Sequence, residues 1–160
     1  MWFFMITCYV MSVITFLLLI TALLQSFFLF SVFKATHLTF IVLTSIIYLF
    51  TETLVIFFFV GTGVSVRDYV QEKKLSPDFH KRSLAVKFKV YPPLLLNMLL
   101  MIILFILVGA VDTGCIPRWI YQIFFVLSLA HFIYAKQVQN DCFRDNTENI
   151  LAMAGVKRKN

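Results

Sequence analysis

The sequence predicts an all-α integral membrane protein in which four transmembrane helices form two antiparallel hairpins, joined by a basic amphipathic cytoplasmic loop. The first observation is composition: the 160 residues are 61% hydrophobic and 14% charged, whereas soluble domains are roughly 45–50% apolar and about 25% charged. The second is a set of four apolar runs whose lengths approach or exceed the ~20 residues that span a bilayer. The third is a strong asymmetry of Lys and Arg between the connections. The chain is therefore expected to be one membrane domain over residues 1–160.

The first hairpin is predicted from two long apolar runs with a short polar link between them. Span one, about 3–33, contains no charged residue and is long enough to cross the membrane at a tilt. Because no positive charge precedes it, we do not expect a cleaved signal peptide. Span two, about 38–62, ends near Gly61-Thr62-Gly63, a sequence that favours a helix end or hinge.

The second hairpin follows a polar stretch. Pro92-Pro93 is predicted to open span three, about 93–112, because proline is tolerated in the first turn of a helix. Span four is predicted at about 118–136. Tyr134 and Lys136 at its far end match the aromatic and basic anchors found at membrane interfaces.

Orientation follows from the basic residues. The loop 63–92 contains seven of them and the tail 137–160, with Lys136 at its border, contains five, whereas the opposite connections contain only Lys34 and Arg118. Because short loops rich in Lys and Arg stay inside, both termini are predicted to be cytoplasmic. The expected location is a bacterial inner membrane or an equivalent organellar membrane.

The loop 63–92 is predicted to lie along the membrane surface. Its basic side chains are expected to contact anionic lipid headgroups or a partner subunit, and they are Lys73, Lys74, Lys81, Arg82, Lys87 and Lys89. The segment 86–90 fits a helical face and also alternates as a strand does, so its structure stays open. Because the basic residues flank apolar spans, their partners are expected to be lipids and membrane proteins, and nucleic acid is excluded.

Three polar residues inside the spans form the candidate site: Glu52, Asn97 and His131. They lie 15, 15 and 13 residues from the expected outer ends of their spans at His37, Asp112 and Arg118, which is about 20–22 Å of helix for each. This arithmetic predicts one common depth. If the helix faces converge at this depth, a hydrogen bond between Glu52 and His131, with Asn97 nearby, would satisfy each group. Thr51, Thr53 and Ser128 are further candidates for the same network.

Three interpretations of this cluster are open. Polar groups that pair across helices stabilise helix association in lipid. A carboxylate and an imidazole also suit a proton or ion relay. In the third interpretation, Glu52 or His131 contacts a neighbouring protein.

Neither a cofactor nor a catalytic motif is predicted. Cys8, Cys115 and Cys142 lack metal-ligand spacing. His37, His80 and His131 are expected at different depths, which disfavours a haem held by two of them, although a single-histidine site or one completed by another subunit stays open. The chain contains no Walker, dinucleotide-binding, metalloprotease or nucleophile-elbow sequence.

The resulting functional prediction is a small non-catalytic accessory subunit of a larger inner-membrane complex, with an energy-converting or transport complex as the expected host. The alternative is a small proton- or ion-conducting protein that uses the Glu52–His131 pair.

Overall fold

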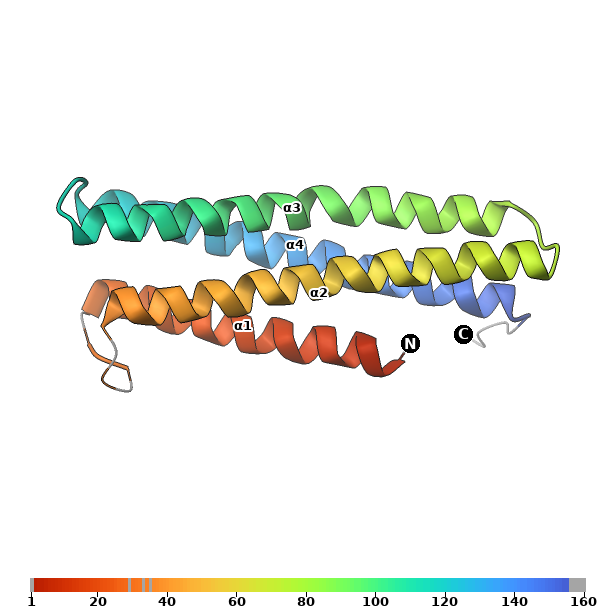
Figure 1. The fold of residues 1–160 in the computed structure, drawn as a ribbon, viewed down its shortest axis with the longest axis horizontal. Coiled ribbons are helices and arrows are strands. Elements are labelled where there is room, and N and C mark those ends of the chain that lie inside the picture. The colour runs from red at the N-terminus through yellow and green to blue at the C-terminus, as the bar shows by residue number, and fades with distance from the viewer. Residues whose placement is uncertain (1, 29, 33, 35, 156–160) are drawn as a thin grey trace.

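The computed structural model describes residues 2–28, 30–32, 34 and 36–155, and these fold into four long helices that pack sequentially antiparallel (Figure 1). The helices are α1 (Trp2–Phe28), α2 (His37–Glu72), α3 (Asp78–Asp112) and α4 (Arg118–Met153). Each is long and apolar enough to cross a membrane. The predicted all-α, four-helix fold class is thus confirmed, and the four candidate spans support a multi-pass membrane protein.

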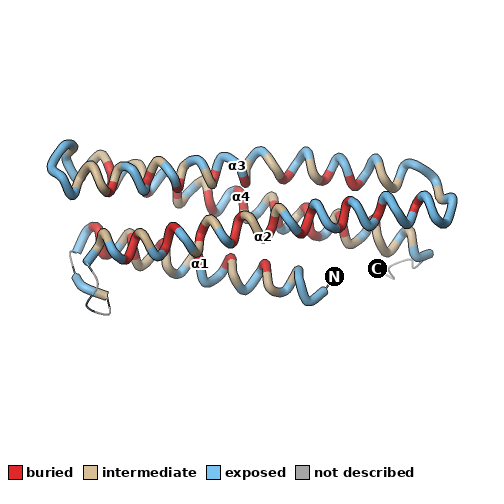
Figure 2. Tube along the Cα trace, viewed as in Figure 1, coloured by how far each residue is buried: buried red, intermediate tan, exposed pale blue. Residues whose placement is uncertain are grey.

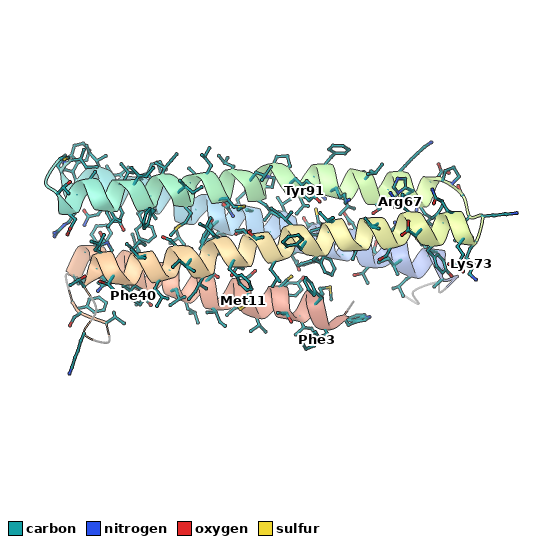
Figure 3. All side chains as sticks on the ribbon, viewed as in Figure 1. Phe3, Met11, Phe40, Arg67, Lys73 and Tyr91 are labelled. Atoms are coloured by element: carbon teal, nitrogen blue, oxygen red, sulfur yellow. The ribbon has the colours of Figure 1, made fainter. Side chains whose placement is uncertain are left out.

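The two ends of the bundle differ. One end, here called the basic end, holds the connection 73–77 and the described ends of the chain near Trp2 and Gly155 (Figure 1). The other, the opposite end, holds the connections 29–36 and 113–117. At the basic end, α2, α3 and α4 continue past the start of α1, so that three helices form an extension there (Figure 1). Lys73 lies at the tip of this extension, and Phe3 lies near its base (Figure 3).

The helices are longer than the apolar runs that predicted them. Most of the expected loop 63–92 is helical, because α2 continues to Glu72 and α3 already begins at Asp78. Pro92 and Pro93 therefore lie inside α3 and not at its start. The expected tail 137–160 is likewise helical as far as Met153, and its residues 156–160 lie outside the described part. The length of an apolar run reflects the bilayer thickness of about 30 Å. A helix of 36 residues is about 54 Å long and therefore extends beyond the bilayer.

Packing between helices also determines the secondary structure of segment 86–90, for which the sequence allowed helix or strand. It is helical, and Val86 and Val90, one turn apart, are both buried against Phe143 and its neighbours. This contact requires the helical period. The basic residues between them consequently point to other sides of α3, where Lys89 is exposed and Lys87 half-buried.

Buried residues follow the facing sides of the helices, and exposed residues follow their outer sides (Figure 2). The buried apolar residues form two clusters. The cluster toward the opposite end contains Leu19, Ala22, Phe40, Ile41, Tyr48, Met101, Leu104, Val108, Tyr121, Phe125 and Phe132. The cluster toward the basic end contains Cys8, Val55, Phe58, Phe59, Val86, Val90, Leu94, Cys142 and Phe143. Between these clusters lie the buried polar side chains of Glu52 and Asn97.

Candidate functional site

The polar residues between the two apolar clusters form a layer, here called the polar layer, which consists of Glu52, Asn97, His131 and Lys136. Glu52 on α2 and Asn97 on α3 are both fully buried. The amide Nδ2 of Asn97 donates to Oε1 of Glu52 at 3.2 Å. On its other side, Oδ1 of Asn97 lies 2.6 Å from Nδ1 of His131 on α4. Because Asn97 uses its amide nitrogen for Glu52, its oxygen accepts, and Nδ1 of His131 carries the proton.

The structure thus brings together all three residues selected from the sequence, but with a different connection. The direct Glu52–His131 hydrogen bond that was expected for converging helix faces is replaced by a chain in which Asn97 lies between them. Depth along a helix follows from residue number, whereas the rotation of each helix about its axis depends on packing. Equal depth therefore predicted proximity but not the order of contacts.

Lys136 is the member of the polar layer that the sequence analysis missed, since it was assigned to the membrane interface. Its Nζ lies 3.0 Å from Oε1 of Glu52. It also donates to Oε1 of Gln139 at 2.8 Å and lies 5.0 Å from the ring centroid of Phe132. A basic residue near Glu52 in depth was a candidate partner, because a carboxylate in an apolar span is stabilised by a cation. Lys136 follows His131 by five residues, about 7.5 Å of helix, which a lysine side chain can reach.

Electrostatically, the polar layer is a buried ion pair with hydrogen-bonding neighbours. The Glu52 side chain is 0% exposed and that of Lys136 is 16% exposed. An unpaired charge at such a site strongly lowers the stability of the fold, whereas the net contribution of a complete ion pair to stability is close to zero. Oε1 of Glu52 serves both Lys136 and Asn97, while Oε2 is buried without a hydrogen-bond partner among the described residues.

A hydroxyl contact links the first helix to the same region. The Oγ1 atoms of Thr15 on α1 and Thr51 on α2 lie 2.8 Å apart and are buried. Tyr48 donates to the backbone oxygen of Asn97 at 3.4 Å. Ser128, which the sequence also suggested, donates instead to the backbone oxygen of Phe124 in its own helix. Polar contacts near the polar layer therefore involve all four helices.

The polar layer is separated from the opposite end by packed apolar residues. Tyr48, Leu104, Phe125 and Phe132 belong to the cluster that fills the bundle on that side. Polar contacts resume near the opposite end, where Nε2 of His37 lies 2.9 Å from the Tyr121 hydroxyl. The charged groups of the polar layer therefore have a packed apolar cluster on the side that faces the opposite end.

The histidines and acidic residues are dispersed. His37 lies at the start of α2, His80 near the start of α3, and His131 in the polar layer. Within the described part of the chain, no three His, Cys, Asp or Glu residues come close enough to hold a metal ion.

The basic residues predicted to contact lipid or a partner lie on or beside the extension at the basic end. Lys73 pairs with Glu72 at 3.5 Å and Lys81 with Asp78 at 3.8 Å, both at exposed positions, where an ion pair contributes little. Lys89 bridges α3 to Asp145 of α4 at 3.2 Å. The remaining three are Lys74 and Arg82, which are exposed, and Lys87, which is half-buried.

Lys87 lies across Gly63 of the neighbouring helix. A Cβ atom at position 63 would stand 2.6 Å from Cε of Lys87. The glycine therefore allows this long side chain to cross α2 closely.

Comparisons of the chain with protein-family models, with curated proteins and with solved structures find no match.

Proposed function

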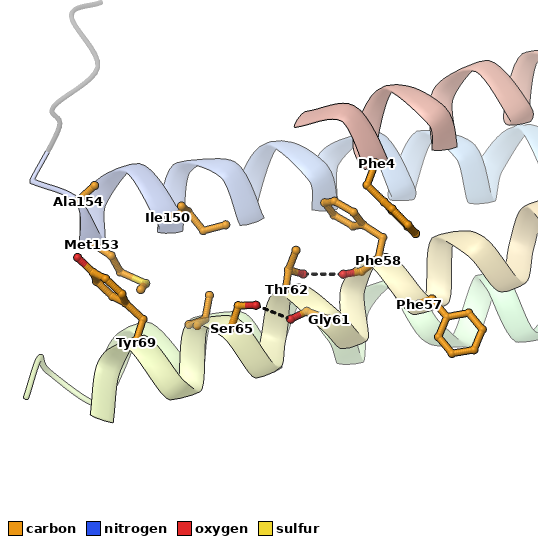
Figure 4. Close-up of a pocket in the computed structure, with 11 residues that line it drawn as sticks. Phe4, Phe57, Phe58, Gly61, Thr62, Ser65, Tyr69, Ile150, Met153 and Ala154 are labelled. Atoms are coloured by element: carbon orange, nitrogen blue, oxygen red, sulfur yellow. Dashed lines mark hydrogen bonds between the residues drawn. The ribbon is translucent and has the colours of Figure 1, made fainter. Parts of the chain in front are cut away.

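We propose that the chain is a non-catalytic accessory subunit of a larger membrane complex, and that a partner subunit docks at its basic end. The observation that carries this proposal is an apolar groove between α2 and α4, directly beyond the start of α1 (Figure 4). The asymmetry of Lys and Arg supports an orientation with the basic end in the cytoplasm. An energy-converting or transport complex is the host that we propose.

The groove has a cavity volume of about 640 Å³. Its walls are mainly apolar, and the hydroxyl groups of Thr62 and Ser65 are already used within α2. Thr62 donates to the backbone oxygen of Phe58 at 2.9 Å, and Ser65 donates to that of Gly61 at 3.0 Å (Figure 4). The lining residues contributed by α4 are Ile150, Met153 and Ala154. Such a surface favours an apolar side of a partner over a polar ligand.

The proposed occupant is an amphipathic helix of the partner subunit. The groove is continuous with the surface of α2 on which α1 packs. There, Phe4 stacks on Phe58 with ring centroids 6.1 Å apart. A helix in the groove would therefore extend an interface that already exists in this bundle. Residues 63–92 contain seven basic and three acidic side chains, so we expect acidic residues on the outer side of the partner helix.

Filling the groove is expected to release the partner. Gly61 lines the groove, and a Cβ at this position meets no atom within 4 Å, so the first side-chain carbon of Gly61→Leu enters open space and the leucine adds bulk to the groove. Leucine also has a better helix propensity than glycine, which is about 0.8–1 kcal/mol less favourable than alanine. After gentle detergent extraction, native electrophoresis is expected to show wild type migrating with unrelated subunits, whereas Gly61→Leu is at least tenfold depleted from that band.

Gly109→Leu is the matched control, because a Cβ at position 109 in α3 also meets no atom within 4 Å and Gly109 does not line the groove. This variant is expected to migrate as wild type does. Migration of the wild-type chain only as a monomer or homo-oligomer would contradict the proposal, as would an undiminished complex with Gly61→Leu.

The alternative function is proton or ion conduction, and the observation that favours it is the polar layer, in which the ionisable Lys136, Glu52 and His131 are linked through the Asn97 amide. The packed apolar cluster beside it argues against a continuous path. We therefore expect Glu52→Gln and wild type to give equal proton and cation flux when reconstituted in vesicles, both at the level of empty vesicles. A flux above that level that Glu52→Gln abolishes would replace the accessory-subunit proposal with the conducting one.

A further inference from the structure

A second groove, between α1 and α4, lies beside the polar layer and combines one polar end with one apolar end. Its cavity volume is about 370 Å³, within the range of roughly 300–1,000 Å³ that is common for ligand sites. Among its lining residues, Val13, Phe16, Phe132 and Ile133 lie toward the middle of the bundle, and Tyr9, Ser12, Lys136 and Asn140 lie toward the basic end. α1 and α4 pack less closely than the other neighbouring helices.

The polar end of this groove contains unused hydrogen-bonding capacity. A lysine ammonium has three N–H donors, and Lys136 uses two of them for Glu52 and Gln139. The Ser12 hydroxyl is buried and has no hydrogen-bond partner among the described residues. The buried hydroxyls of Thr44 and Ser45 donate to the carbonyl one turn earlier, whereas those of Ser26 and Tyr91, which do not line this groove, also lack a partner among the described residues. A buried polar group without a partner requires an explanation.

We infer that the groove between α1 and α4 binds one phospholipid from the leaflet at the basic end, through its phosphodiester and one acyl chain. The third N–H of Lys136 and the Ser12 hydroxyl donate to phosphate oxygens. The acyl chain follows Val13 and Phe16 of α1 and the facing Phe132 and Ile133 of α4. This orientation agrees with a headgroup at the membrane interface and a chain that points toward the bilayer centre.

The charge of the site distinguishes this binding from attraction to surface lysines. Glu52 already balances the charge of Lys136, so the phosphodiester binds as a hydrogen-bond acceptor and extra negative charge is not needed. Phosphatidylglycerol and phosphatidylcholine share the phosphodiester and the acyl chains, and we expect their affinities to agree within about threefold. Attraction to exposed lysines alone would instead favour the anionic lipid strongly.

The test is native mass spectrometry of the purified full-length chain in a non-ionic detergent, with each lipid added stepwise. We expect one strongly retained lipid per chain with either phospholipid, and none with inorganic phosphate. Val13→Trp, which fills the groove from a side chain that is 57% exposed, is expected to reduce lipid retention at least tenfold. Ser12→Ala is expected to reduce it about fivefold, which is the loss of one hydrogen bond of about 1 kcal/mol.

Val10→Trp is the matched control, because Val10 is 51% exposed on the same helix and does not line the groove. It is expected to retain the lipid as wild type does, and unchanged helical circular dichroism checks that each variant folds. Retention of the anionic lipid alone, unchanged retention with Val13→Trp, or equal losses with Val10→Trp would each overturn the inference.

Discussion

Lys136→Met is expected to destabilise the folded bundle by about 3 kcal/mol, one of the largest effects of any single substitution here, because removing one partner of a buried ion pair leaves an uncompensated charge. The charge that remains belongs to Glu52, which is 0% exposed. Asn97 donates a single hydrogen bond to the same carboxylate and does not neutralise it. Thermal unfolding of the purified protein in detergent, followed by circular dichroism, measures the loss.

The two partners of the pair are expected to differ. Glu52→Gln leaves a lysine whose side chain is 16% exposed and can move its ammonium toward the interface, so this variant should lose about 1 kcal/mol. The double variant Glu52→Gln, Lys136→Met removes both charges and should lie close to wild type, since a buried pair is often replaceable by neutral groups. Additive losses in this double-mutant cycle would contradict the ion pair.

Phe143→Ala is expected to cost about 3–4 kcal/mol, because it opens a cavity where three other rings meet. Phe143 is 1% exposed. Its ring centroid lies 4.9 Å from that of Phe58, 5.2 Å from that of Phe59 and 5.1 Å from that of Tyr9. One side chain of α4 therefore contacts both α1 and α2 at the basic end. The loss should appear in the same thermal unfolding experiment.

Phe88→Ala is the matched control, because it removes the same atoms from α3 at a position that is 76% exposed. We expect a change of less than about 0.5 kcal/mol, which is usual for exposed positions away from special contacts. Equal losses for the two phenylalanines would show that the aromatic contacts of Phe143 do not hold the helices together.

Part of the candidate site could be predicted from the sequence. The level shared by Glu52, Asn97 and His131 follows from the constant rise per residue of an α-helix, which converts residue number to depth. Lys136 was missed because its position at the end of an apolar run is also typical of an interfacial anchor. Only packing shows that its side chain returns toward the polar layer and contacts Glu52.

The sequence by itself determined the fold class and the separation of the basic residues toward one end. Apolar runs long enough to cross a membrane require helices, because backbone groups in lipid must pair within the segment. Only the tertiary structure decided where the helices end and which sides face one another. Val66 and Val70 are buried in the extension at the basic end, and Val86 and Val90 are buried beside the first turns of α1, so helix contacts continue beyond the apolar runs. Hydropathy indicates whether a segment lies in lipid or in water, whereas helix length and helix pairing depend on contacts between side chains that are distant in sequence.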